Sequence, residues 1–134
     1  MSPSLTIAEI PTVKAAKGAT ATITIKAHLA SGYHANSHTP TDAYLIPLAL
    51  TWTDGPLKMQ KIDYPAGSME KYPFSDKPLS VVTGDFSITT QFKVPANAAS
   101  GPAAQKGGLK FQACDTQRCY APKTVPVNIT VSVE

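Results

Sequence analysis

Hydrophobic and polar residues alternate with a period of two along much of the chain, which is the pattern of strands with one buried face. The alternation is clearest in Ala21–Leu29, Ile88–Val94 and Val125–Val133, where nearly every second residue is apolar. Shorter segments predict further strands, and these are Leu5–Ile10, Tyr44–Thr53, Leu57–Tyr64, Leu79–Thr83 and Leu109–Ala113. No segment combines helix caps with the 3.6-residue period that an amphipathic helix requires.

Turn sequences rich in glycine, proline, aspartate and serine separate these strands, as in Asp54–Pro56. Many short strands with frequent turns are typical of a β-sandwich or a β-barrel. The proline-, alanine- and glycine-rich stretch Pro95–Gly107 predicts a long surface loop. Tyr33–Asp42 and Met69–Pro78 also lack a strand pattern and are rich in aromatic residues, proline and aspartate. We expect them to be loops that carry function.

Composition and charge narrow the class of protein. The 134 residues are enough for one domain with its own core, and 43% hydrophobic against 16% charged residues exclude a disordered chain or a coiled coil. The net charge of +3 comes from scattered lysines and a single arginine, which argues against a nucleic-acid interface. No apolar run approaches the roughly 20 residues of a membrane helix. Residues Met1–Ser4 lack the regions of a signal peptide, so we expect a cytosolic protein or a processed one.

Cys114 and Cys119 are the two cysteines of the chain. The alternation of the preceding strand places Phe111 and Ala113 on the apolar face and turns Cys114 to the other face, which is unusual for a thiol that only fills a core. A structural disulfide in so small a loop would gain only about 2 kcal/mol. A redox-active pair fits the short spacing, because one thiol can resolve a mixed disulfide formed on the other. The positive charge of Arg118 would favour the reactive thiolate.

A metal site is the third interpretation of the cysteines. Zinc prefers about four nitrogen or sulfur ligands in paired short spacings. The chain offers two cysteines and the histidines His28, His34 and His38, all of which are far from the cysteines in the sequence. A blue-copper site is disfavoured, because no histidine or methionine follows Cys119. We therefore expect no metal and no cofactor, although these residues alone leave all three interpretations open.

Several motifs together resemble the N-terminal periplasmic domain of the thiol:disulfide interchange protein DsbD. They are Gly32–Ser37 (GYHANS), Tyr44–Pro47 (YLIP), Leu50–Trp52, Tyr64–Pro65 and the cysteine segment Phe111–Pro122. Their combination in this order is specific, and the resemblance extends from Tyr33 to the C-terminus. It implies an all-β fold, an immunoglobulin-like antiparallel β-sandwich with a redox-active cysteine pair at a loop edge. Residues 1–134 would form one such domain, either excised from a larger membrane protein or free-standing.

The resemblance also implies a function and a location in the bacterial periplasm. The pair would take electrons from a membrane-embedded reductase domain and pass them to oxidised thioredoxin-fold proteins, such as disulfide isomerases and cytochrome c maturation factors. The domain would thus be a component of a protein-disulfide reductase, without nucleic acid and as a monomer. By the family's pattern, Cys119 forms the mixed disulfide with partners and Cys114 resolves it.

A cap loop that covers the disulfide is a further feature of the family, and Lys71–Ser75 matches it. Phe74 is our first choice for the capping side chain and Tyr72 the second. The remaining residues expected to line the site are Tyr33, His34, Asn36, Asp115, Arg118 and Tyr120. Among them, His34 and Asn36 are expected as hydrogen-bond partners near the sulfurs, and Asp115 and Arg118 as charges that tune the exchange. Two alternatives remain: a non-catalytic immunoglobulin-like binding module with a structural disulfide, and a periplasmic metal carrier using the cysteines with His34 or His38.

Overall fold

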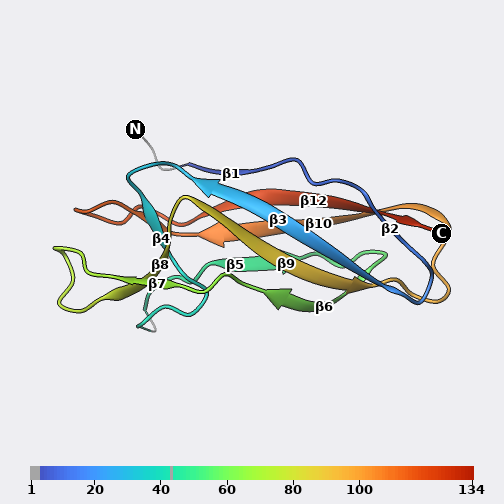
Figure 1. Ribbon diagram of the computed structural model, residues 1–134, viewed down its shortest axis with the longest axis horizontal. Helices are drawn as coiled ribbons and strands as arrows, with labels where there is room; N and C mark the ends of the chain where they lie inside the picture. Colours follow the sequence, from blue (N-terminus) through green and yellow to red (C-terminus); the bar gives the residue numbers. More distant parts are fainter. Residues whose placement is uncertain (1–3, 43) are drawn as a thin grey trace.

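The computed structural model describes residues 4–42 and 44–134, which form strands and turns without any helix. Two four-stranded sheets pack face to face and give the molecule its elongated shape (Figure 1). The first sheet has the order β1 (Leu5–Ile7), β3 (Thr20–Leu29), β9 (Asp85–Lys93) and β6 (Lys58–Asp63). The second has the order β2 (Val13–Ala15), β12 (Lys123–Val133), β10 (Gly101–Phe111) and β5 (Ala49–Trp52). Neighbouring strands are antiparallel except β2 and β12, so the prediction of a sandwich is confirmed.

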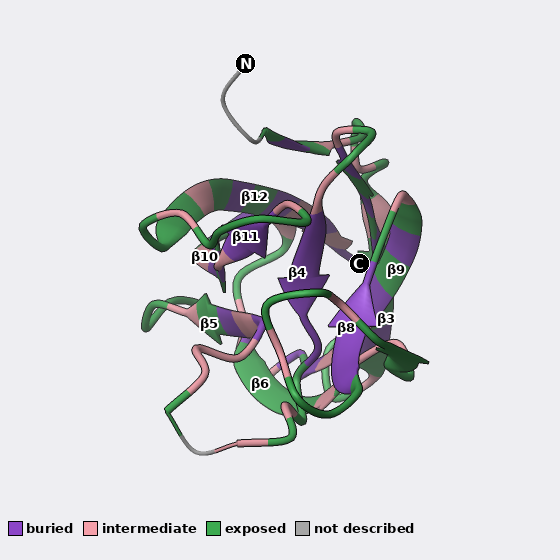
Figure 2. Ribbon diagram, turned by 90° about the vertical axis from the view of Figure 1, so that its left-hand side faces the viewer, coloured by how far each residue is buried: buried purple, intermediate pink, exposed green. Residues whose placement is uncertain are grey.

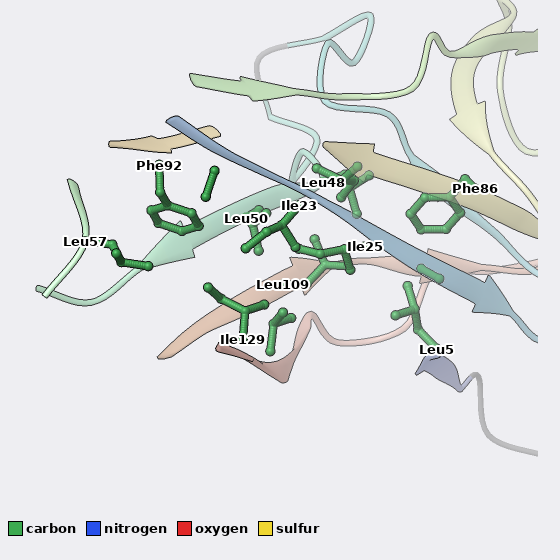
Figure 3. Packing of buried hydrophobic residues seen from close by; sticks show 14 of the residues in the cluster. Leu5, Ile23, Ile25, Leu48, Leu50, Leu57, Phe86, Phe92, Leu109 and Ile129 are labelled. Carbon is green, nitrogen blue, oxygen red and sulfur yellow. The ribbon is translucent and has the colours of Figure 1, made fainter. Parts of the chain in front are cut away.

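The core between the two sheets is built from the period-two positions. In β3, exposed and buried residues alternate without interruption. Ile23 and Ile25 of this strand are among the largest fully buried side chains. Figure 3 shows both close to Leu109 of β10 and Ile129 of β12, which come from the opposite sheet. Burying one such aliphatic side chain stabilises the fold by about 1.5–3 kcal/mol. The alternation in the sequence therefore specifies which face of each sheet forms the core.

Strand β10 shows where the prediction from sequence is wrong. The stretch Pro95–Gly107 is not one long loop, because Gly101–Phe111 forms a single strand that pairs along its whole length with β12. Pairing with the β-branched side chains of β12 overrides the weak strand propensity of the glycine- and alanine-rich sequence. Gly107 lies directly opposite Trp52, and a Cβ at this position would be 2.6 Å from Cε3 of that indole. Glycine therefore permits the close packing of β10 against β5.

A third, smaller sheet covers one end of the sandwich. Its order is β11 (Ala113–Cys114), β4 (His34–Asn36), β8 (Leu79–Val82) and β7 (Ser68–Glu70). Figure 2 shows β4, β8 and β11 as buried strands seen from this end. The segments Tyr33–Asp42 and Met69–Pro78 were expected to be loops, but they contribute β4 and most of β7. Strand β4 lacks a visible alternation because all three of its residues are buried. The small sheet thereby brings two chemically rich segments beside the cysteines.

The other predicted strands are confirmed with altered ends. Tyr44–Thr53 is a strand only at Ala49–Trp52, and Leu5–Ile10 only at Leu5–Ile7. The short strand β2 was not predicted. The expectation about the N-terminus concerns Met1–Ser4, of which all but Ser4 lie outside the described residues. Within the residues that are described, no helix is long and apolar enough to cross a membrane.

Candidate functional site

The two cysteines form a disulfide at the edge of the small sheet. Cys114 ends β11, and Cys119 lies opposite it in an antiparallel bridge, with the two sulfur atoms bonded at 2.00 Å. The two residues differ sharply in exposure, since Cys114 is only 2% exposed whereas Cys119 is exposed. Of the two residues, Cys119 is therefore the one that faces solvent.

The position of Cys114 agrees with the alternation of the strand before it. Ala113 belongs to the main hydrophobic cluster of the sandwich, whereas Cys114 does not. Cys114 is nevertheless buried, because the chain leaves the β10 ladder after Phe111 and pairs with β4 in the small sheet. Cys114 thus lies outside the core of the sandwich and belongs to the small sheet.

Asp115 organises the short loop between the cysteines. Its Oδ1 accepts hydrogen bonds from the backbone N–H groups of Gln117 and Arg118, both at 2.8 Å. Its own N–H donates to the carbonyl oxygen of Arg118 at 2.9 Å. The hydroxyl of Tyr120 donates to Oδ2 at 2.7 Å. One aspartate therefore fixes the turn and ties it to the residue that follows Cys119, as short polar side chains commonly do in turns.

The same contacts determine the electrostatics of the loop. The hydrogen bond from Tyr120 and those from two backbone N–H groups lower the pKa of Asp115 to about 2. The guanidinium of Arg118 lies 4.8 Å from the ring centroid of Tyr120, within range of a cation–π contact. The ring of Tyr120 in turn meets that of Tyr33 edge to face at 5.8 Å. Asp115 therefore carries a negative charge beside the disulfide at every physiological pH.

His34 lies directly opposite Cys114 in the pairing of β4 with β11. Its side chain is buried, and the ring stacks on that of Tyr72 with centroids 3.9 Å apart. Burial lowers the pKa of His34, and the carboxylate of Asp115 acts in the opposite direction. Its Nε2 atom is buried and has no hydrogen-bond partner among the described residues. Burial thus favours the neutral form of the His34 imidazole, on the residue paired with the buried cysteine.

The segment between β7 and β8 places two aromatic rings over this end of the sheet. Tyr72 and Phe74 stack with centroids 5.6 Å apart, and the ring of Phe74 is 6.1 Å from that of His34. Phe74 is 41% exposed and lines a depression of about 510 Å³ together with Cys119. Tyr44 and Leu45 line the same depression. Of the residues considered for the cap, Phe74 therefore lines the same depression as Cys119, and Tyr72 stacks on His34, which is paired with Cys114.

The side-chain amide of Asn36 connects β4 to the cysteine hairpin. Its Nδ2 donates to the carbonyl oxygen of Ile46 at 3.0 Å and to Oε1 of Gln112 at 3.5 Å. Gln112 donates in turn to the carbonyl oxygen of Tyr120 at 3.3 Å. The amide of Asn36 thus bonds two oxygen atoms, and one of them belongs to Gln112, which links Asn36 to the cysteine hairpin.

Sequence reasoning missed Gln112, Lys77 and Asp42 as parts of this region. Gln112 bridges Asn36 to the cysteine hairpin, and it stood within the quoted cysteine motif. Lys77 and Asp42 form an ion pair at 2.8 Å on the wall of the depression beside Cys119. No local pattern links them, because they are distant in sequence and meet only through the small sheet.

The residues considered as metal ligands do not form a cluster in the described ranges, where no group of three or more histidine, cysteine, aspartate or glutamate side chains is arranged to hold an ion. His38 stacks on Tyr64 at 3.6 Å and its Nδ1 lies 2.9 Å from the carbonyl oxygen of Leu48. His28 pairs with Asp85 at 2.7 Å on the exposed face of β3.

Comparison with known proteins identifies the family. A sequence model described as "Thiol:disulfide interchange protein DsbD, N-terminal" matches residues 5–130. The chain belongs to this DsbD N-terminal family. The resemblance drawn from the GYHANS, YLIP and cysteine motifs is thereby confirmed, and the disulfide lies within the matched range.

Solved structures similar to the chain agree with the fold. The DsbD N-terminal domain of Neisseria meningitidis in its reduced form is 16% identical, with a TM-score of 0.50 over 82% of this chain and 77% of that one. The N-terminal periplasmic domain of ScsB from Proteus mirabilis is 13% identical, with a TM-score of 0.61 over 95% of this chain and 44% of its own length. Comparison with curated protein sequences gives no match.

A cohesin from Pseudobacteroides cellulosolvens shares the fold as well, with 14% identity and a TM-score of 0.54 over 97% of this chain and 92% of the cohesin. The immunoglobulin-like sandwich therefore does not define a function by itself. Membership of the DsbD N-terminal family indicates the function: the chain is a thiol–disulfide exchange module that interacts with thiol–disulfide partners. Of the three interpretations of the cysteines, the redox-active pair is the one that this family carries.

Proposed function

We propose that this domain relays electrons in the bacterial periplasm through the Cys114–Cys119 pair, receiving them from a membrane-embedded reductase domain and passing them to oxidised thioredoxin-fold proteins. Membership of the DsbD N-terminal family supports the type of chemistry. The similar domain of ScsB is a periplasmic one, which supports the location. Residues 1–134 act as one monomeric module, and no cofactor takes part.

The observation that carries the proposal is the unequal exposure of the two cysteine residues. Thiol–disulfide exchange begins when a thiolate reaches one sulfur of the disulfide. The exposed Cys119 offers that sulfur, and the buried Cys114 is shielded by the small sheet. Cys119 is therefore the residue that forms the mixed disulfide with partners, and Cys114 is the one that leaves and later resolves it.

Reduction of the domain takes two steps. A thiolate of the reducing partner attacks Sγ of Cys119, the bond to Cys114 breaks, and Cys114 leaves as a thiolate. A second thiol of that partner then attacks the mixed disulfide, so that the partner is oxidised and both cysteines are reduced. In the second half of the relay, the thiolate of Cys119 attacks an oxidised partner. Cys114 then closes the disulfide and releases that partner in its reduced form.

The aromatic rings limit this exchange to partners that dock. Phe74 lines the depression next to Cys119, and its stacking on Tyr72 links it to the buried His34. A partner that displaces Phe74 gains access to the sulfur. Tyr44 and Leu45 then give it an apolar surface to pack against. The depression thus serves as the docking site for a partner's active-site loop, with Phe74 as its cap.

Trapping of a mixed disulfide tests the proposal. Reduced Cys114→Ala protein is mixed with an oxidised thioredoxin-fold protein, and the products are separated without reducing agent and mapped by mass spectrometry. We expect a stable covalent complex through Cys119, because the resolving thiol is missing. Cys119→Ala is the matched control and should give little complex, since Cys114 is buried. Equal trapping by both variants, or trapping through Cys114 alone, would contradict the assigned roles.

A further inference from the structure

A buried histidine shares one face of the small sheet with the disulfide. Cys114 is paired directly with His34 on one side and with Cys119 on the other, both in antiparallel register. Side chains directly opposite one another in antiparallel strands project from the same face, with Cβ atoms about 4.5–5.5 Å apart. The imidazole and both sulfurs therefore lie side by side on that face. Tyr72 stacks on the imidazole from above.

The hydrogen bonding of His34 is incomplete in the disulfide form. Its Nε2 atom is buried and has no partner among the described residues. Buried polar atoms are nearly always hydrogen-bonded, so a buried nitrogen without a partner needs an explanation. The sulfur of a disulfide carries no proton, whereas a cysteine thiol donates one. Reduction of the pair would supply a donor, because it creates a thiol on Cys114, the residue paired directly with His34.

We propose that His34 accepts the proton of the Cys114 thiol when the pair is oxidised and delivers a proton to the Cys114 sulfur when the pair is reduced. The inference rests on the proposed exchange function and adds a proton-transfer residue to it. A nearby base is useful here because the thiolate, and not the thiol, is the nucleophile. Cys114 gains little help from solvent, since the sheet buries it.

The proton and electron movements balance in both directions. In oxidation, the thiol proton of Cys114 passes to the free nitrogen of neutral His34, and the Cys114 thiolate attacks Sγ of Cys119. The bond between Cys119 and the partner breaks, and the partner leaves as a thiolate. Its former disulfide has then gained two electrons, and the imidazolium gives up its proton to solvent. In reduction, His34 takes up a proton from solvent and passes it to the sulfur of Cys114 as that thiolate leaves.

The groups around His34 favour this role. Burial keeps the imidazole neutral, and the carboxylate of Asp115 on the hairpin partly offsets that effect by stabilising the imidazolium formed in the transfer. Tyr72 stacks from the cap side, where burial raises the pKa of its hydroxyl. Lys71 lies next to it and donates to the carbonyl oxygen of Tyr72 at 3.0 Å. From β8, the residues paired with β4 are the apolar Val81 and Val82.

A two-phase reaction with dithiobisnitrobenzoate isolates the step that His34 serves. The exposed Cys119 of the reduced protein attacks the reagent and releases a first thionitrobenzoate. Cys114 then attacks the mixed disulfide on Cys119 and releases the second, so the slower, concentration-independent phase reports on Cys114. We expect His34→Phe to slow this second phase at least about tenfold at neutral pH and to leave the first phase unchanged.

The pH profile separates proton transfer from a structural effect. In the wild type, the second phase should depend weakly on pH from about pH 7 upward, because neutral His34 is already available as a base. In His34→Phe it should rise about tenfold per pH unit, since only the spontaneously ionised thiol of Cys114 reacts. His34→Gln serves as the second variant if the phenylalanine variant folds poorly. His38→Phe is the matched control, because that ring also stacks on a tyrosine, and it should behave as the wild type.

Two outcomes would refute the role of His34, and a third would refute the proposed exchange function. An unchanged second phase with the wild-type pH profile in both His34 variants would refute the role of His34. Equal slowing of both phases without a change of pH profile would assign His34 a purely structural role and would also refute it. A wild type whose cysteines release no thionitrobenzoate, or only the first, would instead contradict the proposed exchange function itself.

Discussion

Removal of the Phe74 ring should make the disulfide easier for small thiols to reduce. The ring stacks on that of Tyr72 at 5.6 Å and lies in the depression that Cys119 lines. Loss of one aromatic pair removes about 0.5–1.5 kcal/mol from the closed state. Since about 1.4 kcal/mol corresponds to a tenfold change in an equilibrium, Phe74→Ala should raise the population of the open state about 2- to 13-fold. If opening precedes attack on Cys119, the reduction rate should rise by the same factor.

Reduction by excess dithiothreitol, quenched with an alkylating agent at successive times, measures this rate. Tyr44→Ala is the matched control, because Tyr44 lines the same depression but is 80% exposed. We expect little change in the control and an effect for Tyr72→Ala at least as large as for Phe74→Ala, since Tyr72 stacks most closely on His34, at 3.9 Å. Rates for Phe74→Ala and Tyr72→Ala that equal the Tyr44→Ala rate would refute the assignment of the cap.

Three further predictions concern the charge of Asp115 and the packing of the core. Asp115→Asn removes a carboxylate that disfavours thiolates nearby, so the reduction potential of the pair should become less negative in a glutathione titration. An unchanged potential would show that the charge of Asp115 does not affect the exchange. The pKa of Asp115 is lowered from 3.8 to about 2, so its contribution to the free energy of unfolding is present above about pH 4 and is lost as the pH falls toward 2. Urea unfolding should therefore show a steeper acid loss in the wild type than in Asp115→Asn. Leu109→Ala, at a fully buried core position, should cost about 2–5 kcal/mol of unfolding free energy and leave the reduction potential unchanged; a shifted potential would mean that core and site are coupled.

The sandwich could be predicted from sequence wherever one face of a strand is buried and the other is exposed. Strands such as Thr20–Leu29 show that contrast at every position. The alternation fails in β4, which is buried on both faces, and in β10, where Gly107 permits close packing against Trp52. In both strands tertiary contacts decide the structure, and local sequence carries no signal of them.

The site was predictable in its parts but not in its arrangement. The cysteine spacing, the aromatic segment and the GYHANS motif could be found in the sequence, although the segment with that motif was expected to be a loop and not a strand. The register of β4 against β11 was not readable, so neither was the position of His34 opposite Cys114. The ion pair of Lys77 with Asp42 likewise depends on the small sheet, which joins segments far apart in the chain.

The reduction potential of the Cys114–Cys119 pair tests the central claim most directly. Equilibration with dithiothreitol or glutathione buffers, followed by alkylation and mass spectrometry, gives the fraction reduced at each potential. A relay that receives and passes on electrons should have a value between those of thioredoxin and DsbA, about −270 to −120 mV. A value below about −300 mV, typical of a structural disulfide, would contradict the account and favour a binding module with an inert bond.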